Sequence, residues 1–229
     1  MNENMYDPDF VKGLFNRMSS SYEKVNYITS FGFSIRWRRQ FIRQFKSTKN
    51  NIQVIDLLTG MGESWNPVKD RFPNATLSAL DFSEEMLRSA QRKNKHSFGN
   101  AINILKQDVL QSELPSEHYD LVICSFGLKT FDAGQLKKLA SETKRILKSG
   151  GYFSFIEVSK PENSFMKRLF GFYLGNIVPV LGKLFLGDPA EYKMLWRYTE
   201  TFENARHATQ IFNEAGLKTN FDSYFYGCA

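Results

Sequence analysis

Short apolar runs that suit β-strands alternate with segments that suit α-helices, and this alternation restricts the fold more than any other feature of the chain. The apolar runs lie at residues 52–58, 75–80, 102–105, 119–126 and 152–158. Strands that alternate with helices form a parallel sheet covered by helices on both faces. The run at 119–126 (YDLVICSF) has a continuous apolar centre, which is typical of a strand buried on both sides. We therefore predict an α/β, Rossmann-like fold with a mostly parallel, twisted sheet.

Residues with capping preferences indicate where the helices begin and end. Asp7-Pro8 and Ser34 predict two helix starts before the sheet. Ser83 predicts another, because two glutamates follow it and favour the first turn of a helix. A further helix is expected over residues 132–147, ended by Ser149-Gly150-Gly151 with a glycine in the left-handed C-cap conformation.

The 229 residues contain no low-complexity stretch or Pro/Gly/Ser-rich linker, so we expect a single domain. A hydrophobic fraction of 42%, with 21 phenylalanines, is sufficient for a buried core. The expected parts are an N-terminal helical cover (1–48), a cofactor-binding core (49–160), a helical lid or substrate region (161–202), and a C-terminal helix and strand (203–229).

A formal net charge of +6 favours contact with something anionic, such as a membrane surface, a nucleic acid or an acidic substrate. Much of the charge lies in residues 36–39 with Arg43 and Lys46, where a solvated helix face is the ordinary interpretation. The apolar segment 169–186 is interrupted by Asn176, Pro179 and Lys183, which favours a lid or an interfacial helix over a membrane span.

Cys124 and Cys228 are the two cysteines of the chain, too few for a disulfide framework or a zinc site. No basic start followed by an apolar stretch indicates a signal peptide at the N-terminus. We therefore expect a reducing, cytoplasmic location, with peripheral membrane contact as an alternative, and no metal.

The carboxyl ends of parallel strands are where such sheets bind ligands, and polar or glycine residues follow several of the predicted strands. Gly60-Met61-Gly62 follows the first strand, and a glycine turn allows close approach of a ligand to backbone N–H donors. Asp81 ends the second strand, where its carboxylate is suited to both hydroxyls of a ribose. Phe82 is a candidate to pack on an adenine, and Asp108 to accept from its amino group.

Two other ligand classes share part of this pattern. A dinucleotide-binding enzyme has the same glycine turn and aspartate but normally keeps a third glycine, where this chain has Trp65. A nucleic-acid methyltransferase must hold a flipped base, and exocyclic-amine enzymes place an Asn/Asp-Pro-Pro-aromatic segment after the fourth strand. Ser125-Phe126-Gly127-Leu128 occupies that place, so nucleic acid is not the expected partner.

Several separated segments, in the same order, resemble the ubiquinone/menaquinone biosynthesis C-methyltransferases over nearly the whole chain. They are residues 15–23 (FNRMSSSYE), Asn26, residues 30–32 (SFG), residues 54–57 (VIDL) with the Gly60/Gly62 turn, residues 125–128 (SFGL), residues 147–151 (LKSGG) and residues 159–161 (SKP).

The resemblance implies a seven-stranded methyltransferase fold with S-adenosylmethionine as cofactor and S-adenosylhomocysteine as product. It also implies transfer to a ring carbon of a phenol or hydroquinone that carries a lipid tail. The combined set of expected cofactor contacts is Tyr22, Asp56, Gly60, Met61, Gly62, Asp81, Phe82, Asp108, Val109 and Ser125. Carbon attack needs an ionised or hydrogen-bonded phenol, and Lys129 is the candidate that assists this ionisation.

The chain departs from the family pattern in three places. Leu58, Thr59 and Met61 replace small residues of the glycine turn, Lys129-Thr130 replaces Arg-Asn, and residues 198–203 do not match Ser-Ile-x-x-Phe-Pro. The family's last strand is also expected to be missing. These departures leave open a lipid or secondary-metabolite acceptor, a non-catalytic protein that binds the cofactor, and a homodimer that rebuilds the sheet edge.

Overall fold

The computed structural model describes residues 4–45, 51–178, 180–181, 189–202 and 204–229. Lys46, Pro179, Lys183 and Glu203, which entered the sequence argument, lie outside these ranges, as does much of the apolar segment's C-terminal part.

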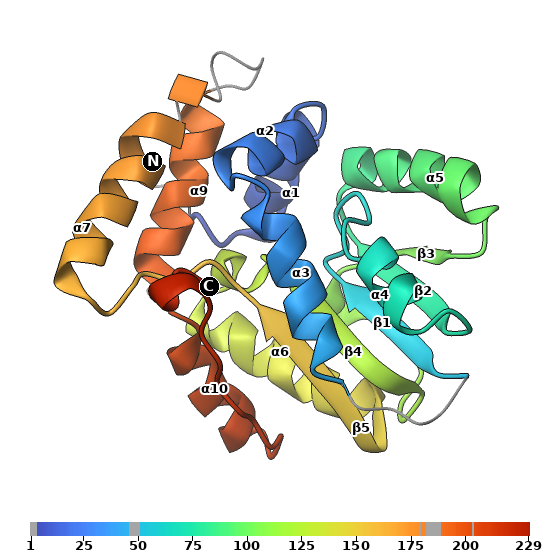
Figure 1. Cartoon of the computed structure of the whole chain (residues 1–229). Helices are drawn as coiled ribbons and strands as arrows, with labels where there is room; N and C mark the ends of the chain where they lie inside the picture. Colours follow the sequence, from blue (N-terminus) through green and yellow to red (C-terminus); the bar gives the residue numbers. More distant parts are fainter. Residues whose placement is uncertain (1–3, 46–50, 179, 182–188, 203) are drawn as a thin grey trace.

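A five-stranded sheet forms the centre of the described structure (Figure 1). Each neighbouring pair is parallel, and the order is β3-β2-β1-β4-β5. The strands are β1 (Gln53–Leu57), β2 (Thr76–Asp81), β3 (Asn103–Lys106), β4 (Tyr119–Ser125) and β5 (Leu147–Ile156). The predicted α/β, Rossmann-like fold with a parallel sheet is therefore confirmed.

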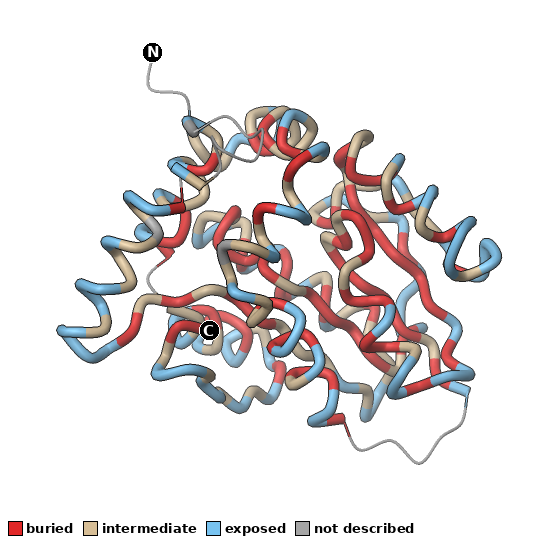
Figure 2. Tube along the Cα trace, turned by 45° about the horizontal axis from the view of Figure 1, so that its top comes forward, coloured by how far each residue is buried: buried red, intermediate tan, exposed pale blue. Residues whose placement is uncertain are grey.

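Helices cover both faces of the sheet because neighbouring residues of its strands point to opposite sides. In β1, Val54 joins a core with α3 (Phe33–Arg43), α4 (Trp65–Arg71) and α5 (Glu84–Phe98). Ile55 joins the opposite core with α6 (Ala133–Ile146) and α10 (Ala205–Glu214). Figure 2 shows that buried positions concentrate along the central strands.

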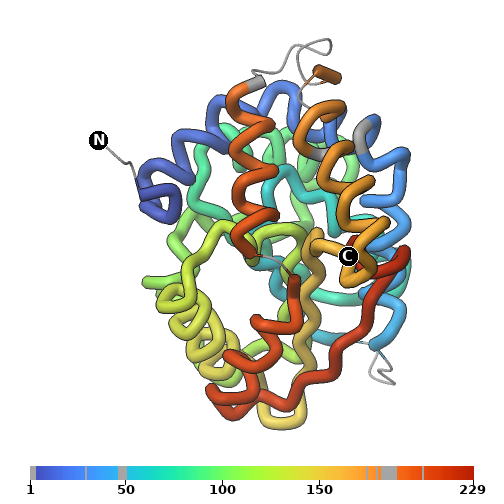
Figure 3. The backbone as a smooth tube through the Cα atoms, turned by 90° about the vertical axis from the view of Figure 1, so that its left-hand side faces the viewer, coloured from blue at the N-terminus to red at the C-terminus, as the bar shows by residue number. Residues whose placement is uncertain are grey.

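A third core lies among the helices at the carboxyl ends of the strands. It joins α1 (Pro8–Met18) and α2 (Tyr22–Thr29) to α9 (Pro189–Phe202), with residues that include Leu14 and Tyr192. Helix α7 (Ser164–Phe172) and the π-helical turn η3 (Tyr173–Ile177) run beside α9 (Figure 3). Within the described ranges, no helix combines the length and apolar character that crossing a membrane requires.

Most of the predicted helix starts are confirmed. The Asp7 side chain accepts from two backbone N–H groups of α1, and Ser83 accepts from Met86 N at the start of α5. Asp132 forms a reciprocal capping box with Gln135. The prediction for Ser34 is wrong, because α3 begins at Phe33 after Gly32, whose φ of 74° turns the chain into the helix.

The predicted glycine C-cap after the sixth helix is also wrong. Helix α6 ends at Ile146, and Leu147 already belongs to β5, where it lies opposite Tyr119 of β4. A register shift between Tyr119 and Leu121 accommodates the extra residues of β5. Gly150, with φ of 72°, therefore lies in the irregular part of β5 and does not end a helix.

The strand predicted near the C-terminus is absent from the described structure. After α10, residues 217–224 run without strand pairing and lead to a short 3₁₀ turn, η4 (Phe225–Gly227). Aromatic side chains, including Phe41, Phe155 and Phe212, line a groove between β5 and this segment. The segment does not extend the sheet, and five strands are described where the family resemblance implies seven.

Candidate cofactor and acceptor site

The turn after β1 has an unusual backbone, which its side chains explain. Leu58, Gly60 and Gly62 all have positive φ, of 55°, 58° and 80°. A Cβ on Gly62 would lie 2.6 Å from the Trp65 ring, which is fully buried and donates from Nε1 to the Thr59 hydroxyl. Trp65 thus packs the helix onto the turn, at the position where a dinucleotide site keeps its third glycine.

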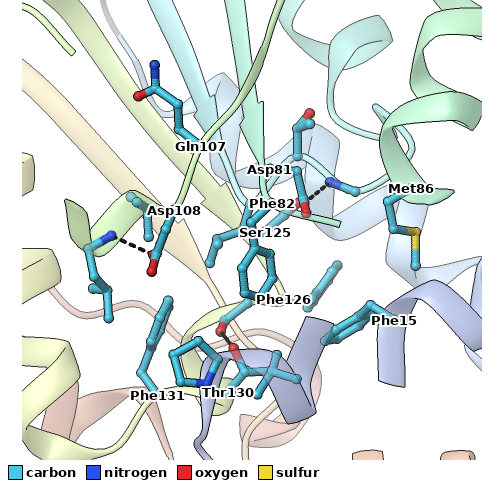
Figure 4. Close-up of a pocket in the computed structure, with 18 of the residues that line it drawn as sticks. Phe15, Asp81, Phe82, Met86, Gln107, Asp108, Ser125, Phe126, Thr130 and Phe131 are labelled. Atoms are coloured by element: carbon cyan, nitrogen blue, oxygen red, sulfur yellow. Dashed lines mark hydrogen bonds between the residues drawn. The ribbon is translucent and has the colours of Figure 1, made fainter. Parts of the chain in front are cut away.

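Asp81 is held at the end of β2 by backbone donors. Its Oδ2 accepts from Gly60 N at 2.8 Å, and its Oδ1 accepts from Ser83 N at 2.9 Å (Figure 4). Burial raises the pKa of this carboxyl to about 6, although the backbone hydrogen bonds act in the opposite direction. The carboxylate is therefore fixed in orientation, and each oxygen retains a lone pair for a ligand.

Asp81 faces a cavity at the carboxyl ends of β1, β2, β3 and β4, with α1 on its outer side (Figure 4). Of the predicted cofactor contacts, seven line this cavity: Tyr22, Gly60, Asp81, Phe82, Asp108, Val109 and Ser125. Asp108 also caps the 3₁₀ turn η1 (Val109–Gln111), where its Oδ1 accepts from Leu110 N. The structure therefore brings together residues that lie about a hundred positions apart in the sequence.

Three of the predicted contacts do not line the cavity. Asp56 lies behind Thr59, whose hydroxyl donates to its Oδ2 at 2.6 Å. Met61 is buried, and Gly62 packs on Trp65. These three residues lie in or beside the turn after β1. The residues of this turn that line the cavity are Thr59, Gly60 and Glu63.

Arg38 and Glu63 line the cavity but were missed from the sequence. Glu63 directly follows the glycine turn, and its Oε2 accepts from Met61 N at 3.1 Å. Arg38 belongs to a run that a charge count assigns to solvent. Arg38 follows Ser34 by four residues and precedes Phe41 by three, and both of these residues are buried. Residues with these spacings share one face of a helix, so Arg38 lies on the inner face of α3.

Asp56 is an unusual buried carboxyl. It is 1% exposed, and its Oδ1 has no hydrogen-bond partner among the described residues. Burial raises its pKa to about 7, although the Thr59 hydrogen bond acts in the opposite direction. Asp56 and Asp81 therefore take up protons in the folded state at a pH where the unfolded chain stays ionised.

We expect the protein to become more stable as the pH falls from 8 to 5. Both folded-state pKa values lie above the ordinary value, so over this range the folded state binds more protons than the unfolded state, and the free energy of unfolding falls as pH rises. The gain should be about 2–4 kcal/mol, mostly from Asp56. Urea unfolding of the wild type and Asp56→Asn at several pH values measures it; an unchanged pH slope in the variant would contradict this assignment.

A second cavity adjoins the first and shares Tyr22, Arg38 and Phe126 with it. Its other walls come from α2, α3, α7, η3 and α9, and they are largely aromatic or aliphatic: Trp37, Val158, Phe170, Tyr173, Val178, Leu195 and Trp196. An apolar cavity with few polar groups is the usual form of a small-molecule site.

Lys129 lines the second cavity and not the first. Its Nζ lies 2.6 Å from Glu157 Oε1 and donates to the Phe126 carbonyl at 2.7 Å. The Lys129 and Glu157 side chains are 7% and 0% exposed, so this is a buried ion pair. The lysine is thus a charged group held in place beside the apolar cavity.

Comparison with known proteins decides the family. The model of the ubiE/COQ5 methyltransferase family matches residues 2–229. The chain belongs to the ubiE/COQ5 methyltransferase family. A demethylmenaquinone methyltransferase of Lactococcus lactis is 30% identical over 208 residues, which cover 90% of this chain and 81% of the relative. A ubiquinone/menaquinone biosynthesis C-methyltransferase UbiE of Rickettsia bellii is 29% identical, with coverage of 91% and 84%.

Solved structures agree with the fold. An S-adenosylmethionine-dependent methyltransferase described as putative, from Methanococcus maripaludis, gives a TM-score of 0.58 at 17% identity, covering 96% of this chain and 89% of that one. A second, from Aquifex aeolicus, gives 0.57 at 18% identity, with coverage of 80% and 81%. With the family match, this establishes a Rossmann-like methyltransferase that uses S-adenosylmethionine and acts on a small acceptor molecule.

The first cavity combines polar and aromatic side chains. Asp81 places a buried carboxylate on its wall, and Phe82 places an aromatic side chain beside it. Gly127 has no room for a side chain, because a Cβ on this residue would lie 2.5 Å from Leu58 Cδ1. Leu58 and Gly127 both line the cavity, so a side chain at position 127 would displace Leu58 within the cavity wall.

Gly127→Ala is therefore expected to weaken cofactor binding. The Gly127 φ of −110° suits alanine, so the added methyl acts by pushing Leu58 toward the cavity. Overpacking of this kind costs about 1–2 kcal/mol, or roughly tenfold in the Kd for S-adenosylhomocysteine. Adding Leu58→Ala should restore binding. A Kd that the double variant fails to recover would show that Leu58 does not carry the effect.

Proposed function

We propose that this methyltransferase transfers the methyl group to a ring carbon of an apolar aromatic acceptor of the phenol or hydroquinone class. The observation that supports it is the apolar cavity that adjoins the Asp81 cavity through Tyr22, Arg38 and Phe126. The relatives named above are quinone-biosynthesis enzymes, which favours the same class of acceptor.

Each residue that lines the first cavity is assigned to one part of the cofactor. In this proposal Asp81 accepts from the ribose hydroxyls, and Phe82, Asp108 and Val109 hold the adenine. Tyr22 closes the cavity from the N-terminal cover, and Ser125 lies toward the second cavity, where the acceptor binds. Helices α7 and α9 act as the lid over the acceptor.

S-adenosylmethionine supplies a methyl group on a sulfonium, which is already activated for transfer. The protein must hold the acceptor carbon in line with that methyl and exclude water, which suits a cavity closed by aromatic side chains. Lys129 places a positive charge beside the acceptor cavity and stabilises an ionised phenolic oxygen there. Glu157 holds the ammonium in position through the ion pair.

Replacing both members of the Lys129–Glu157 ion pair should lower turnover and leave cofactor binding nearly unchanged. Lys129→Ala alone would leave the buried Glu157 without a counter-ion, which costs about 3–5 kcal/mol of stability. The double variant Lys129→Met/Glu157→Gln avoids this and should lower kcat by roughly 100-fold, with the Kd for S-adenosylhomocysteine changed by less than about twofold. A turnover equal to wild type would remove Lys129 from the proposed mechanism.

The experiment that tests the acceptor class uses S-adenosylmethionine with a ¹³C-labelled methyl group. The protein is incubated with short-chain benzohydroquinones and naphthohydroquinones under anaerobic conditions, and NMR of the product shows the atom that received the label. The proposal expects an aryl methyl carbon. A methoxy or methylamino signal with these or other acceptors would contradict carbon transfer.

We also propose that the protein takes its acceptor from a membrane surface. Helix α7 exposes Phe165, Leu169 and Phe172 beside the charged side chains of Lys167 and Arg168, a pattern that favours anionic interfaces. The same helix lines the acceptor cavity with Phe170. Sedimentation with phosphatidylglycerol vesicles should be lost in Phe165→Ser/Leu169→Ser; equal binding by both proteins would contradict this role of α7.

A further inference from the structure

Arg38 is a buried charged side chain that the proposed roles leave unused. It lies on the inner face of α3 and is 6% exposed. Its Nε donates weakly to the Ser125 hydroxyl at 3.4 Å, and its guanidinium carbon lies 4.7 Å from the centre of the Phe126 ring. A guanidinium remains charged at any pH that a protein tolerates, so Arg38 brings a permanent positive charge to this place.

Most of the hydrogen-bonding capacity of Arg38 is not used within the described residues. An arginine has five N–H donors, and the bond to Ser125 is the one that the structure shows. No carboxylate of the described chain lies within ion-pair distance of it. A guanidinium that lines a cavity and has no carboxylate partner there is suited to an anionic ligand.

The position of Arg38 favours the cofactor as the source of that anion. Ser125, its hydrogen-bond partner, lines the first cavity and contacts the Ser64 hydroxyl at 2.9 Å, at the start of α4. Asp108 follows β3 and Phe82 follows β2, whereas Ser125 ends β4, on the other side of β1 in the sheet. If Phe82 and Asp108 hold the adenine and Asp81 the ribose, the amino-acid end of the cofactor reaches Arg38.

The charges of this region match that end of the ligand. The carboxylates on the cavity wall are Glu63, Asp81 and Asp108, with Asp56 behind Thr59, and Arg38 is the cation among the described residues that line the cavity. S-adenosylmethionine carries a sulfonium, an ammonium and one carboxylate. Met61 N in the glycine turn already donates to Glu63, so this donor is engaged by the protein's own carboxylate.

We infer that Arg38 binds the α-carboxylate of S-adenosylmethionine through its forked N–H donors. A fork of two parallel N–H groups fits a carboxylate in a bidentate pair, which adds orientation as well as affinity. Stacking on Phe126 keeps the plane of the guanidinium fixed. The residue therefore fixes the end of the cofactor opposite the adenine, at the boundary with the acceptor cavity. This inference depends on the cofactor assignment and not on the identity of the acceptor.

The test compares S-adenosylmethionine with decarboxylated S-adenosylmethionine, which lacks only the carboxylate. Calorimetric titration should show that the wild type prefers the intact cofactor by roughly tenfold or more, as expected for a hydrogen bond to a charged group. In Arg38→Met the Kd for the intact cofactor should rise by about the same factor, and the Kd for the decarboxylated ligand should change by less than about twofold. Arg36→Met, an exposed position on the same helix, serves as the matched control.

A second variant, Arg38→Lys, and the unfolding temperatures without ligand show whether a weaker affinity comes from lost binding contacts or from a damaged fold. Arg38→Lys retains the positive charge without the fork and should show an intermediate preference. Both Arg38 variants should unfold near the wild-type temperature without ligand, and the stabilisation by S-adenosylmethionine should shrink only in them. An unchanged preference in Arg38→Met would overturn the inference. Unchanged cofactor Kd with reduced turnover would assign Arg38 to the acceptor, whereas a wild type that binds neither ligand would overturn the cofactor site itself.

Discussion

Replacing Asp81 by asparagine is expected to raise the Kd for S-adenosylhomocysteine by about 100-fold. In the proposed complex the carboxylate accepts from two ribose hydroxyls, and hydrogen bonds to a charged group contribute about 1.5–3 kcal/mol each. An amide would also point its NH₂ at the Gly60 or the Ser83 N–H, both of which now donate to the carboxylate. Calorimetric titration of the purified variant measures this loss.

Asp70→Asn is the matched control for Asp81→Asn, because Asp70 is exposed on α4 and away from both cavities. Its Kd should equal that of the wild type. The circular dichroism spectrum of each variant shows whether the fold is retained. If Asp81→Asn binds S-adenosylhomocysteine within about threefold of the wild type, the ribose assignment is wrong.

Gly62→Ala is expected to destabilise the protein more than Gly99→Ala or Gly127→Ala. The added Cβ would lie 2.6 Å from two atoms of the Trp65 ring, which is fully buried and hydrogen-bonded to Thr59. The φ of 80° adds the cost of a left-handed backbone. We expect the free energy of unfolding to fall by about 3–4 kcal/mol, measured by urea unfolding.

Gly99→Ala separates the two causes of that loss. Gly99 also has a positive φ, of 57°, but a Cβ there meets no atom within 4 Å. This variant should therefore lose only about 1–2 kcal/mol, the backbone share. If both variants lost the same free energy, the contact with Trp65 would have no effect on stability.

The sheet was predictable because its central strands are buried on both faces and are therefore mostly apolar. Residues 119–126 show this most clearly, and β4 indeed lies between β1 and β5 in the sheet. Caps at Asp7, Ser83 and Asp132 were predictable because the interaction is local, between a side chain and the next turn of backbone.

Other features depend on contacts that the sequence does not show. Gly150 resembles a helix C-cap, but the pairing of β5 with β4 extends the strand back to Leu147 and overrides this local preference. The C-terminal strand failed to form for a similar reason, since pairing with β5 would need the intervening aromatic groove to close. In both cases long-range packing decides the structure.

The candidate site divides in the same way. Asp81 and Asp108 follow strands directly, so the rule that ligands bind at the carboxyl ends of strands places them in the cavity. Arg38 reaches the same cavity from α3, and the partner of Lys129 is Glu157, 28 positions along the chain. The sequence around Arg38 and Lys129 does not show their surroundings, because the burial of Arg38 and the pairing of Lys129 depend on elements that are distant in sequence.

The most direct test of the account is calorimetric titration of the wild-type protein with S-adenosylhomocysteine. We predict one binding site per chain with a Kd on the order of 1–100 µM, since enzymes bind such ligands near their cellular concentrations. In Asp81→Asn the Kd should rise by about 100-fold. The absence of binding by the wild type at a ligand concentration of about 1 mM would contradict the assignment of the cavity at Asp81 to the cofactor.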